Sequence, residues 1–415
     1  MTVPTTVIVG ASIGGVRTAQ ALRNGGYEGR VVLVGEESAL PYDKPPLSKA
    51  FLAGTSTVEQ MTLLSEAEAR GAGIELELGR PAAGLDLAGS TIELAGGSRL
   101  RFDDLVIATG ARARSSPWGR PPGVHVVRTL SDASALRADL LAGGPVVIVG
   151  AGFIGAEIAA TAGGMGVDVT LVDPVDVPLS RVLNPSVAEI FGRLHVARGV
   201  RTRFGTGVAG IRGTAGDLEV VLDDGSELAA ATVVVGIGAV PNDEWLRDSG
   251  LVVDDGVLCD SFSRTSRAPR VHAVGDVARW HHPVYERSVR SEHWTNAVEQ
   301  AACVAHNITN PDRPRVHAPT EYVWSDQYDW KIQLAGRTGG DLRHVTVPGA
   351  DPHRCFAVLY ADVGDEFAGA LVVNWPRALI SCRRALLDKT TIDVVRDTIS
   401  AAASKAGTSS GRVLR

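Results

Sequence analysis

Two glycine-rich turns, each placed between a continuous apolar run and a helix-like stretch, constrain this sequence more than any other feature. The first turn, residues 10–15 (Gly-Ala-Ser-Ile-Gly-Gly), follows residues 6–9 (Thr-Val-Ile-Val). The second turn, residues 150–155 (Gly-Ala-Gly-Phe-Ile-Gly), follows residues 145–149 (Pro-Val-Val-Ile-Val). Continuous apolar runs, as opposed to alternating ones, are typical of strands buried in a parallel sheet. Each turn therefore predicts a strand followed by a helix.

A second apolar run follows each predicted helix, at residues 30–34 and 168–172. Strand, helix and strand in this order form a right-handed βαβ unit. We therefore expect an α/β fold with two doubly wound, Rossmann-like nucleotide-binding domains. From Tyr322 onward the composition shifts toward short strands, which predicts a separate C-terminal α+β domain. The small, polar residues 404–415 are expected to form a flexible tail.

The composition argues against several classes of function. A net charge of −6 over 415 residues gives no reason to expect nucleic-acid binding. No continuous apolar stretch reaches the roughly 20 residues of a membrane span. The N-terminus runs directly into a strand pattern without a basic region and a long apolar core, so we expect no signal peptide. The cysteines are scattered, without metal-ligand spacing, which fits a reducing compartment; they are Cys259, Cys303, Cys355 and Cys382. We expect a cytoplasmic protein with no membrane, nucleic-acid or metal binding.

The first turn has the context of a dinucleotide-binding fingerprint, because it follows a strand and opens a helix whose N-terminus can hold a pyrophosphate. Ser12 stands where the middle glycine of the fingerprint normally lets the pyrophosphate approach the backbone. We expect this small residue to be tolerated. Glu36, after the second strand, stands about where an acidic residue binds ribose hydroxyls. Taken alone, the turn is equally compatible with a purely structural role.

The second turn is a complete G-x-G-x-x-G fingerprint, formed by Gly150, Gly152 and Gly155. Asp173 ends the next strand, where its carboxylate suits the 2′-hydroxyl of NADH and would repel the 2′-phosphate of NADPH. No Arg or Lys stands between Asp173 and Ser180 to bind that phosphate. The sequence therefore favours NADH over NADPH.

Several strings elsewhere carry a family resemblance. They are residues 40–49 (Leu-Pro-Tyr-Asp-Lys-Pro-Pro-Leu-Ser-Lys), 108–111 (Ala-Thr-Gly-Ala), 274–276 (Val-Gly-Asp) and 324–329 (Trp-Ser-Asp-Gln-Tyr-Asp). In order and spacing the chain resembles the FAD-dependent ferredoxin and rubredoxin reductases, which have the glutathione-reductase-like fold and include reductases of bacterial P450 and aromatic-ring dioxygenase systems. The resemblance runs through Gly336, over roughly four-fifths of the chain.

The resemblance implies a set of FAD-binding residues. In it, Asp276 would bind the ribityl hydroxyls from the carboxyl edge of a sheet, and a helix beginning at Trp294 would direct its positive dipole end at the flavin pyrimidine. For Trp294 the alternative is an ordinary core aromatic. The implied FAD residues are Gly10, Ser12, Gly14, Gly15, Glu36, Lys44 (in place of a frequent arginine), Lys49, Ala82, Thr109, Gly110, Arg128, Gly275, Asp276 and Trp294.

The resemblance also implies a catalytic pair. In the wider fold, residues at the positions of Lys49 and Glu157 pair beside the flavin N5 and support the nicotinamide stacking site. The alternative for each residue alone is a solvated side chain. Gly238 is expected near the nicotinamide, and the remaining NAD-binding residues are Gly150, Gly152, Gly155 and Asp173.

The missing cysteines narrow the expected reaction. Disulfide reductases of this fold carry a redox-active cysteine pair after the first βαβ unit, but residues 41–52 contain no cysteine. Electrons must then leave from the flavin itself. We expect NADH to deliver a hydride to FAD N5, followed by transfer of single electrons to a [2Fe–2S] ferredoxin or a rubredoxin that feeds a P450 or ring-hydroxylating oxygenase. The protein is expected to be a monomer or a weak homodimer.

Such partners are usually acidic, so a basic docking patch is expected. For each candidate the alternative is ordinary solvated charge. The candidates are Arg287, Arg290, Lys331, Arg337, Arg343 and Arg377.

Two other functions stay open: an NADH oxidase or quinone-type diaphorase, and a redox-sensing flavoprotein resembling apoptosis-inducing factor. The cysteine-free stretch beside Lys49 counts against oxidases that use a lone cysteine near the flavin.

The expected domains are an FAD-binding domain at residues 1–110 and 239–318, an NAD-binding domain at 111–238, the α+β domain at 319–403 and the tail at 404–415.

Overall fold

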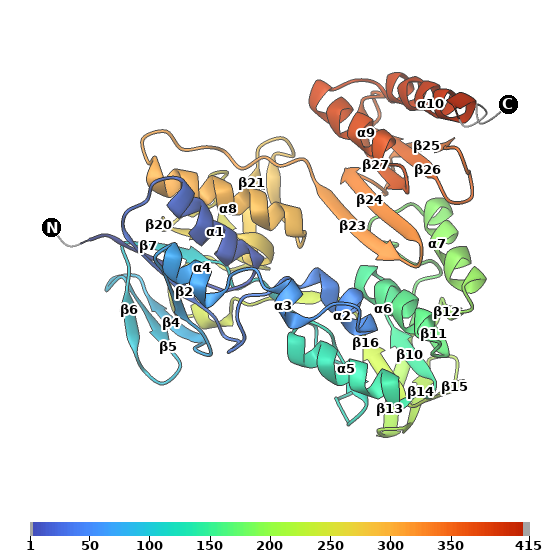
Figure 1. The fold of residues 1–415 in the computed structure, drawn as a ribbon, viewed down its shortest axis with the longest axis horizontal. Helices are drawn as coiled ribbons and strands as arrows, with labels where there is room; N and C mark the ends of the chain where they lie inside the picture. The colour runs from blue at the N-terminus through green and yellow to red at the C-terminus, as the bar shows by residue number, and fades with distance from the viewer. Residues whose placement is uncertain (1–2, 410–415) are drawn as a thin grey trace. The chain divides into compact units, whose positions relative to one another are not determined.

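The computed structural model describes residues 3–409, with side chains described for residues 3–403. The chain divides into two compact units, each built around its own sheets (Figure 1). Unit 1 comprises residues 1–46, 56–112 and 239–319, and unit 2 comprises residues 47–55, 113–238 and 320–415. Residues 47–55 were expected within the FAD-binding domain, but they group with unit 2.

The nine-stranded sheet of unit 1 has its first βαβ unit where the sequence predicts it. β1 (Thr5–Val9), α1 (Ile13–Asn24) and β2 (Arg30–Val34) follow in order. β1 pairs in parallel with β2 on one side and with β7 (Asp104–Ile107) on the other, so Val9 stands opposite Val34 and Ile107. The strand order is β22-β21-β18-β19-β20-β7-β1-β2-β3.

Successive residues of each central strand enter different cores of unit 1, which explains the continuous apolar runs. Ile8, Leu33 and Val106 pack against α1 and α8 (Trp294–Thr309), which lie side by side on one face. Val7 and Val9 pack on the other face, where a three-stranded sheet adds Ile92 and Leu94. Both faces of the central strands are therefore covered by apolar side chains.

The remaining elements of unit 1 are α3 (Val58–Met61), α4 (Glu66–Gly71), β3 (Ile74–Glu77), β4 (Ala82–Asp86), β5 (Thr91–Leu94), β6 (Arg99–Arg101), β17 (Ala239–Pro241), η2 (Glu244–Leu246), β18 (Val257–Cys259), β19 (Arg264–Thr265), β20 (Ala268–Ala273), η3 (Gly275–Val277), β21 (Ala278–His282) and β22 (Arg287–Arg290). Two short elements, η1 (Pro45–Ser48) and β8 (Ala111–Ala113), span the sequence boundaries between the units.

Unit 2 repeats the same architecture around the second turn. Its parallel sheet has the order β12-β11-β10-β16-β9, which matches β3-β2-β1-β7-β20 of unit 1 position by position. A three-stranded antiparallel sheet precedes β16, as another precedes β7. Its elements are β9 (Val124–His125), α5 (Leu130–Ala142), β10 (Val146–Val149), α6 (Phe153–Gly164), β11 (Val169–Asp173), α7 (Pro185–Ala197), β12 (Arg201–Phe204), β13 (Val208–Thr214), β14 (Asp217–Leu222), β15 (Glu227–Ala230) and β16 (Thr232–Val235).

The segment 47–55 belongs to unit 2 because of its apolar side chains. It contains α2 (Ala50–Ala53), and Leu52 is fully buried. Leu52 packs in the same core as Leu136 and Leu140 of α5 and Ile158 of α6. This packing places Ser48 and Lys49 against α6, the helix that follows the second glycine turn.

The predicted C-terminal α+β domain is a five-stranded antiparallel sheet with the order β23-β24-β27-β26-β25. One face packs against two helices, and the other packs against α7 through Val358 and Tyr360, which contact the cluster around Phe191. The elements are β23 (Tyr322–Gln327), β24 (Trp330–Gly336), β25 (Arg343–Pro348), β26 (Phe356–Ala361), β27 (Phe367–Val373), α9 (Pro376–Asp388) and α10 (Ile392–Ser409).

Helix α10 continues to Ser409, so residues 404–409 of the predicted tail are helical, and residues 410–415 lie outside the described residues. Among the described residues, no helix combines the length and the apolar composition that crossing a membrane requires.

Candidate functional site

The two glycine turns have the same backbone construction at the carboxyl ends of β1 and β10. Gly10 and Gly150 have φ angles of +118° and +105°. A Cβ at Gly15 would lie 1.8 Å from the Gly10 carbonyl oxygen, and one at Gly155 would lie 1.9 Å from the Gly150 carbonyl oxygen. No side chain fits at these positions, so the helices begin close against the strands, as the dinucleotide fingerprint requires.

Ser12 occupies the position that Gly152 has in the second turn. Both residues precede their helix in extended backbone, with φ −102° at Ser12 and −74° at Gly152, so neither position requires glycine for its conformation. A Cβ at Gly152 would meet no protein atom within 4 Å. The Ser12 hydroxyl makes no capping hydrogen bond to its helix. The open space beside Gly152, at the N-terminus of α6, fits a pyrophosphate in the second turn.

Asp173, at the end of β11, holds the second turn in place. One carboxylate oxygen accepts a hydrogen bond from the Ala151 N–H at 2.7 Å, and the other accepts from the Val175 N–H at 2.9 Å. A carboxylate has about four acceptor sites, so two backbone donors leave capacity for ribose hydroxyls. Asp173 therefore fits an adenosine ribose and also orders the turn beside it.

The corresponding corner of unit 1 is acidic and exposed. Glu36 lies two residues beyond β2 and is exposed, and Ala82 begins β4 and is half-buried. Lys44 does not stand in open solvent: its Nζ lies 3.1 Å from a Glu37 carboxylate oxygen and 3.3 Å from the Tyr42 hydroxyl. The Lys44 ammonium group is therefore paired with the Glu37 carboxylate.

Thr109 and Gly110 are held rigidly at the end of β7. The Thr109 hydroxyl donates to the Asn242 carbonyl at 2.7 Å, and the Asn242 amide donates back to the Thr109 carbonyl at 2.9 Å. The Asn242 N–H also donates to the Gly110 carbonyl at 2.9 Å. These bonds tie the chain leaving unit 1 to the chain returning to it.

The turn at Gly275 is hydrogen-bonded to α8, although β21 and β22 separate the two in the sequence. The Gly275 N–H donates at 2.8 Å to the side chain of Gln300, which is fully buried. The Asp276 carbonyl accepts from Arg290 at 3.2 Å. Trp294 is the first residue of α8, and its indole N–H donates to Asp43 at 2.8 Å. Trp294 is thus a fixed, half-buried ring at a helix N-terminus and not a core aromatic.

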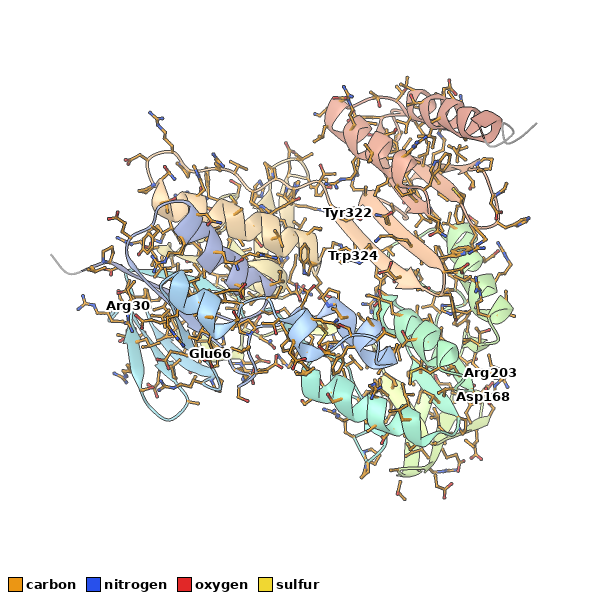
Figure 2. All side chains as sticks on the ribbon, viewed as in Figure 1. Arg30, Glu66, Asp168, Arg203, Tyr322 and Trp324 are labelled. Atoms are coloured by element: carbon orange, nitrogen blue, oxygen red, sulfur yellow. The ribbon has the colours of Figure 1, made fainter. Side chains whose placement is uncertain are left out.

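Lys49 and Glu157 form the ion pair that the family resemblance implies. Lys49 Nζ lies 2.8 Å from Glu157 Oε2, and the Glu157 side chain is only 3% exposed. Two serines complete the site: Ser48 Oγ donates to Glu157 Oε2 at 2.5 Å, and Ser325 Oγ donates to Oε1 at 2.8 Å. Ser325 comes from β23, whose Tyr322 and Trp324 are labelled in Figure 2.

Sequence reasoning missed the roles of Ser48 and Ser325. Each stands inside a string that carries the family resemblance, which is the only signal that could have identified them. Two strings far apart in the sequence meet on one carboxylate, which is unusual for an ordinary surface ion pair.

Arg128 and Gly238, which were also predicted, lie in unit 2. Arg128 directly precedes Thr129, the N-cap of α5, and its N–H donates to Asp132 at 3.2 Å. Gly238 has φ +113°, and a Cβ there would lie 3.6 Å from Arg181 Nη1 and 4.0 Å from Arg114 Nε. Both distances are ordinary van der Waals contacts, so the positive φ, and not crowding, is what favours glycine at this position.

Two of the predicted docking cations are engaged elsewhere. Arg290 is 15% exposed and pairs with Asp255 at 3.2 Å and Glu292 at 2.6 Å. Arg343 is more exposed but pairs with Asp365 at 2.6 Å. The other four candidates are exposed, as Arg343 is: Arg287, Lys331, Arg337 and Arg377.

The cysteines offer no disulfide chemistry in this structure. All four are free thiols, with Cys259 and Cys382 buried and Cys303 and Cys355 partly buried. Burial raises the pKa of the Cys303 thiol to about 11 and that of the Cys382 thiol to about 12, which keeps both protonated at neutral pH. Among the described side chains, no group of three or more His, Cys, Asp or Glu residues is placed to hold a metal ion.

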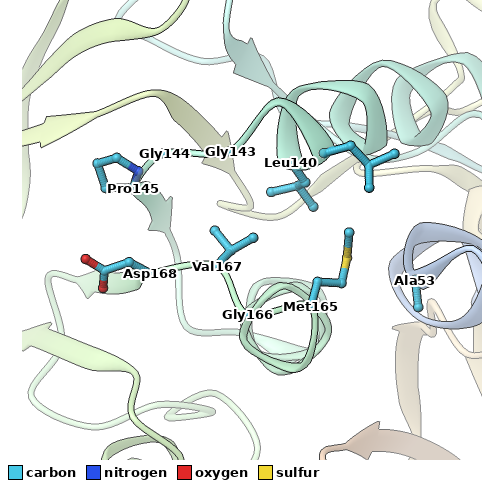
Figure 3. A pocket seen from close by; sticks show the side chains of 10 residues that line it. Ala53, Leu140, Gly143, Gly144, Pro145, Met165, Gly166, Val167 and Asp168 are labelled. Atoms are coloured by element: carbon cyan, nitrogen blue, oxygen red, sulfur yellow. The ribbon is translucent and has the colours of Figure 1, made fainter.

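A cavity of about 720 Å³ lies at the amino ends of the strands of the unit 2 parallel sheet, whereas the glycine turn lies at their carboxyl ends (Figure 3). Pro145 and Asp168, which line it, directly precede β10 and β11. Nucleotides bind at the carboxyl ends of parallel strands, so this cavity at the amino ends is not the dinucleotide site.

Two dinucleotide-binding turns in one chain, with a lysine–glutamate pair beside the second, define an oxidoreductase with two nucleotide-binding modules. Residues 4–301 match the family model described as pyridine nucleotide-disulphide oxidoreductase, and residues 322–401 match the model described as reductase C-terminal. The chain belongs to the pyridine nucleotide-disulphide oxidoreductase family.

Three relatives illustrate the similarity. Rhodocoxin reductase of Rhodococcus erythropolis is 36% identical over 383 residues, covering 92% of this chain and 88% of that protein. The ferredoxin–NAD(+) reductase component of the anthranilate 1,2-dioxygenase system of Burkholderia cepacia is 37% identical, covering 92% and 93%. The solved covalent putidaredoxin reductase–putidaredoxin complex matches with a TM-score of 0.90 at 33% identity, covering 97% of this chain and 100% of that one.

Proposed function

We propose that this chain is an NADH-dependent, FAD-containing ferredoxin reductase. It takes electrons from NADH and passes them singly to a [2Fe–2S] ferredoxin or a rubredoxin that serves a P450 or a ring-hydroxylating oxygenase. The observation that carries the proposal is the Lys49–Glu157 ion pair in a segment without cysteine. Because residues 41–52 lack a thiol pair, electrons cannot leave this site through disulfide exchange.

The protein's own residues would divide the work between the two units. In unit 1, the turn around Gly10 and Gly15 would bind the FAD pyrophosphate, Glu36 the ribose, and the start of α8 at Trp294 the flavin pyrimidine edge. In unit 2, Lys49 and Glu157 would orient the nicotinamide. When bound, FAD supplies the redox chemistry, accepting a hydride from NADH and releasing electrons one at a time.

NADH is favoured over NADPH by the end of β11. The Asp173 carboxylate is fixed by two backbone N–H groups, so it cannot turn away from a ribose beside it. A 2′-phosphate there would meet a fixed negative charge. Residues 174–180 contain no Arg or Lys to compensate.

The acceptor class is supported by the names of the relatives and by the surface. Relatives include the reductase components of a dioxygenase system and a complex of a reductase with putidaredoxin. Exposed cations such as Arg377 and Lys331 on the C-terminal domain suit the acidic surface of such carriers. The four free thiols are in keeping with a cytoplasmic location, which is also part of the proposal.

Steady-state kinetics of the FAD-loaded protein test the proposal. NADH oxidation is measured with a [2Fe–2S] ferredoxin, with a rubredoxin, with a quinone and with oxygen alone, and each is repeated with NADPH. The proposal predicts that NADH with an iron–sulfur or rubredoxin acceptor is at least about tenfold faster than NADH with oxygen alone. Equal rates with all acceptors would indicate a diaphorase or oxidase. Slow turnover with every acceptor, together with a persistent NADH complex, would indicate a sensor.

A further inference from the structure

The Glu157 carboxylate is held by three donors from two segments that are distant from it in the sequence. Oε2 accepts from Lys49 Nζ and Ser48 Oγ, and Oε1 accepts from Ser325 Oγ. Both serines are almost fully buried, at 2% exposed for Ser48 and 0% for Ser325. The lysine is a compact point charge that fixes a distance but not the plane of a carboxylate. Hydroxyl donors on both oxygens fix that plane.

Each serine is itself aimed at the carboxylate. Gln327 Nε2 donates to Ser325 Oγ at 3.2 Å, so the serine proton is left for Glu157. Gln327 is fully buried two residues further along β23. On the other side, the Thr161 hydroxyl of α6 donates to the Ser48 carbonyl at 2.8 Å and holds that backbone against the helix that carries Glu157.

We propose that Ser325 and Ser48 are positioning residues for the Lys49–Glu157 pair. Through Ser325, the C-terminal domain contributes directly to the site where the nicotinamide is oriented. The inference rests on the proposed function, because it assigns these serines to the NADH half of that reaction. Without Ser325, Glu157 keeps its partner lysine but loses the only donor that its Oε1 has among the described residues, and its orientation is no longer unique.

The physical reason for an effect on rate is pre-organisation. A catalytic group must be held within about 0.5 Å of its productive position by its supporting residues. The Lys49 side chain is 19% exposed and has a flexible four-carbon stem, so it cannot do this alone. The serines matter for the limiting rate of reduction by NADH and not for the later transfer of electrons to the acceptor.

The test uses the FAD-loaded full chain as Ser325→Ala and Ser48→Ala, with Thr232→Val as the matched control. Thr232 is also buried, at 1% exposed, but it begins β16, at the opposite end of the sheet from the glycine turn. Anaerobic stopped-flow mixing with NADH separates the limiting rate of flavin bleaching from the Kd of NADH. Crystal structures of the variants report the Lys49 Nζ–Glu157 Oε2 distance, and thermal unfolding reports stability.

The expected result is a limiting rate about tenfold lower for Ser325→Ala, with a smaller change in Kd and a displaced Glu157 carboxylate in the crystal structure. Electron transfer to ferredoxin from chemically reduced protein stays at the wild-type rate. Ser325→Thr, which retains the hydroxyl, restores most of the loss, and Thr232→Val behaves as wild type. If Ser325→Ala fails to fold, Ser48→Ala carries the same prediction from the other carboxylate oxygen.

A limiting rate within twofold of wild type, with Glu157 unmoved, overturns the positioning role while leaving the reductase assignment intact. If NADH fails to bleach the flavin of the wild-type protein, the proposed function fails, and the positioning role fails with it.

Discussion

Lys49 Nζ lies 2.8 Å from Glu157 Oε2, although the two residues are 108 positions apart in the sequence. The contact exists because Leu52, three residues after Lys49, is buried in the core beneath α6, the helix on which Glu157 stands. Apolar packing of a short segment therefore brings an ammonium group to a carboxylate that is 3% exposed. A charge buried to this degree is stable only with a partner.

Replacing Lys49 tests the stability side of this relationship. Lys49→Met keeps most of the side-chain volume but leaves Glu157 with two hydroxyl donors and no counter-charge. We expect the free energy of unfolding to fall by about 3 kcal/mol, as for other broken buried pairs. Urea unfolding followed by circular dichroism measures it. Lys331→Met, at an exposed lysine, should change stability by less than about 0.5 kcal/mol. An equal effect of both variants would contradict the pairing argument.

Replacing two glycines of the second turn by alanine should affect two different properties, stability at Gly155 and NADH affinity at Gly152. Gly155→Ala places a Cβ 1.9 Å from the Gly150 carbonyl oxygen, so the backbone must shift. We expect it to destabilise the protein by about 1–3 kcal/mol. Gly152→Ala meets no atom within 4 Å and should leave stability unchanged. Because its Cβ enters the space of the pyrophosphate, however, it should weaken NADH binding.

Thermal unfolding without NADH and equilibrium titration with NADH separate these two effects. Wild-type stability of Gly155→Ala, or wild-type NADH affinity of Gly152→Ala, would show that the second turn does not hold a dinucleotide in this manner.

The local parts of the fold were predictable, and the reason is visible at the two turns. Gly10, Gly15, Gly150 and Gly155 are required by contacts within a few residues along each turn or with the adjacent strand, so their pattern survives in the linear sequence. Continuous apolar runs likewise report strands covered on both faces.

The long-range parts were not predictable from the residues. Ser325 lies 168 positions from Glu157 in the sequence, and no local sequence pattern around a serine predicts a contact at that distance. The grouping of residues 47–55 with unit 2 follows from Leu52, which any core could have accommodated. From the sequence Arg290 is a candidate docking cation, but in the structure it forms ion pairs with Asp255 and Glu292.

Coenzyme preference should follow the charge at the end of β11. Because Asp173 also accepts the Ala151 N–H, alanine there would loosen the turn, whereas Asp173→Asn retains an acceptor. We expect Asp173→Asn combined with Val175→Arg to raise the ratio of kcat/KM for NADPH over NADH by at least about tenfold. Asp176→Asn with Val175→Arg, which changes a neighbouring exposed carboxylate, is the control. A native preference for NADPH, or equal shifts in both variants, would contradict the role of Asp173.

Three buried histidines make stability depend on pH. Desolvation lowers the pKa of His195, His272 and His317 from 6.5 to about 4, so each is neutral in the folded protein at pH 5. The unfolded chain binds protons below pH 6.5 and the folded protein does not until about pH 4. The free energy of unfolding therefore falls as the pH falls through this window.

Replacing one of these histidines makes the dependence shallower. In His195→Gln, the slope of the free energy of unfolding between pH 6 and 5 should decrease by up to about 1.4 kcal/mol per pH unit. Denaturant unfolding at each pH measures it, with His281→Gln at an exposed histidine as the control. An unchanged slope in His195→Gln would show that His195 does not stay neutral in the folded protein.

The most direct test of the proposed function is an anaerobic titration of the FAD-loaded protein with NADH, followed by absorbance, and then addition of an oxidised [2Fe–2S] ferredoxin. The proposal predicts that about one equivalent of NADH bleaches the flavin absorbance and that about two equivalents of ferredoxin, each accepting one electron, restore it within the mixing time. Bleaching that persists in the presence of ferredoxin, and is reversed only when oxygen or a quinone is admitted, would contradict the assignment.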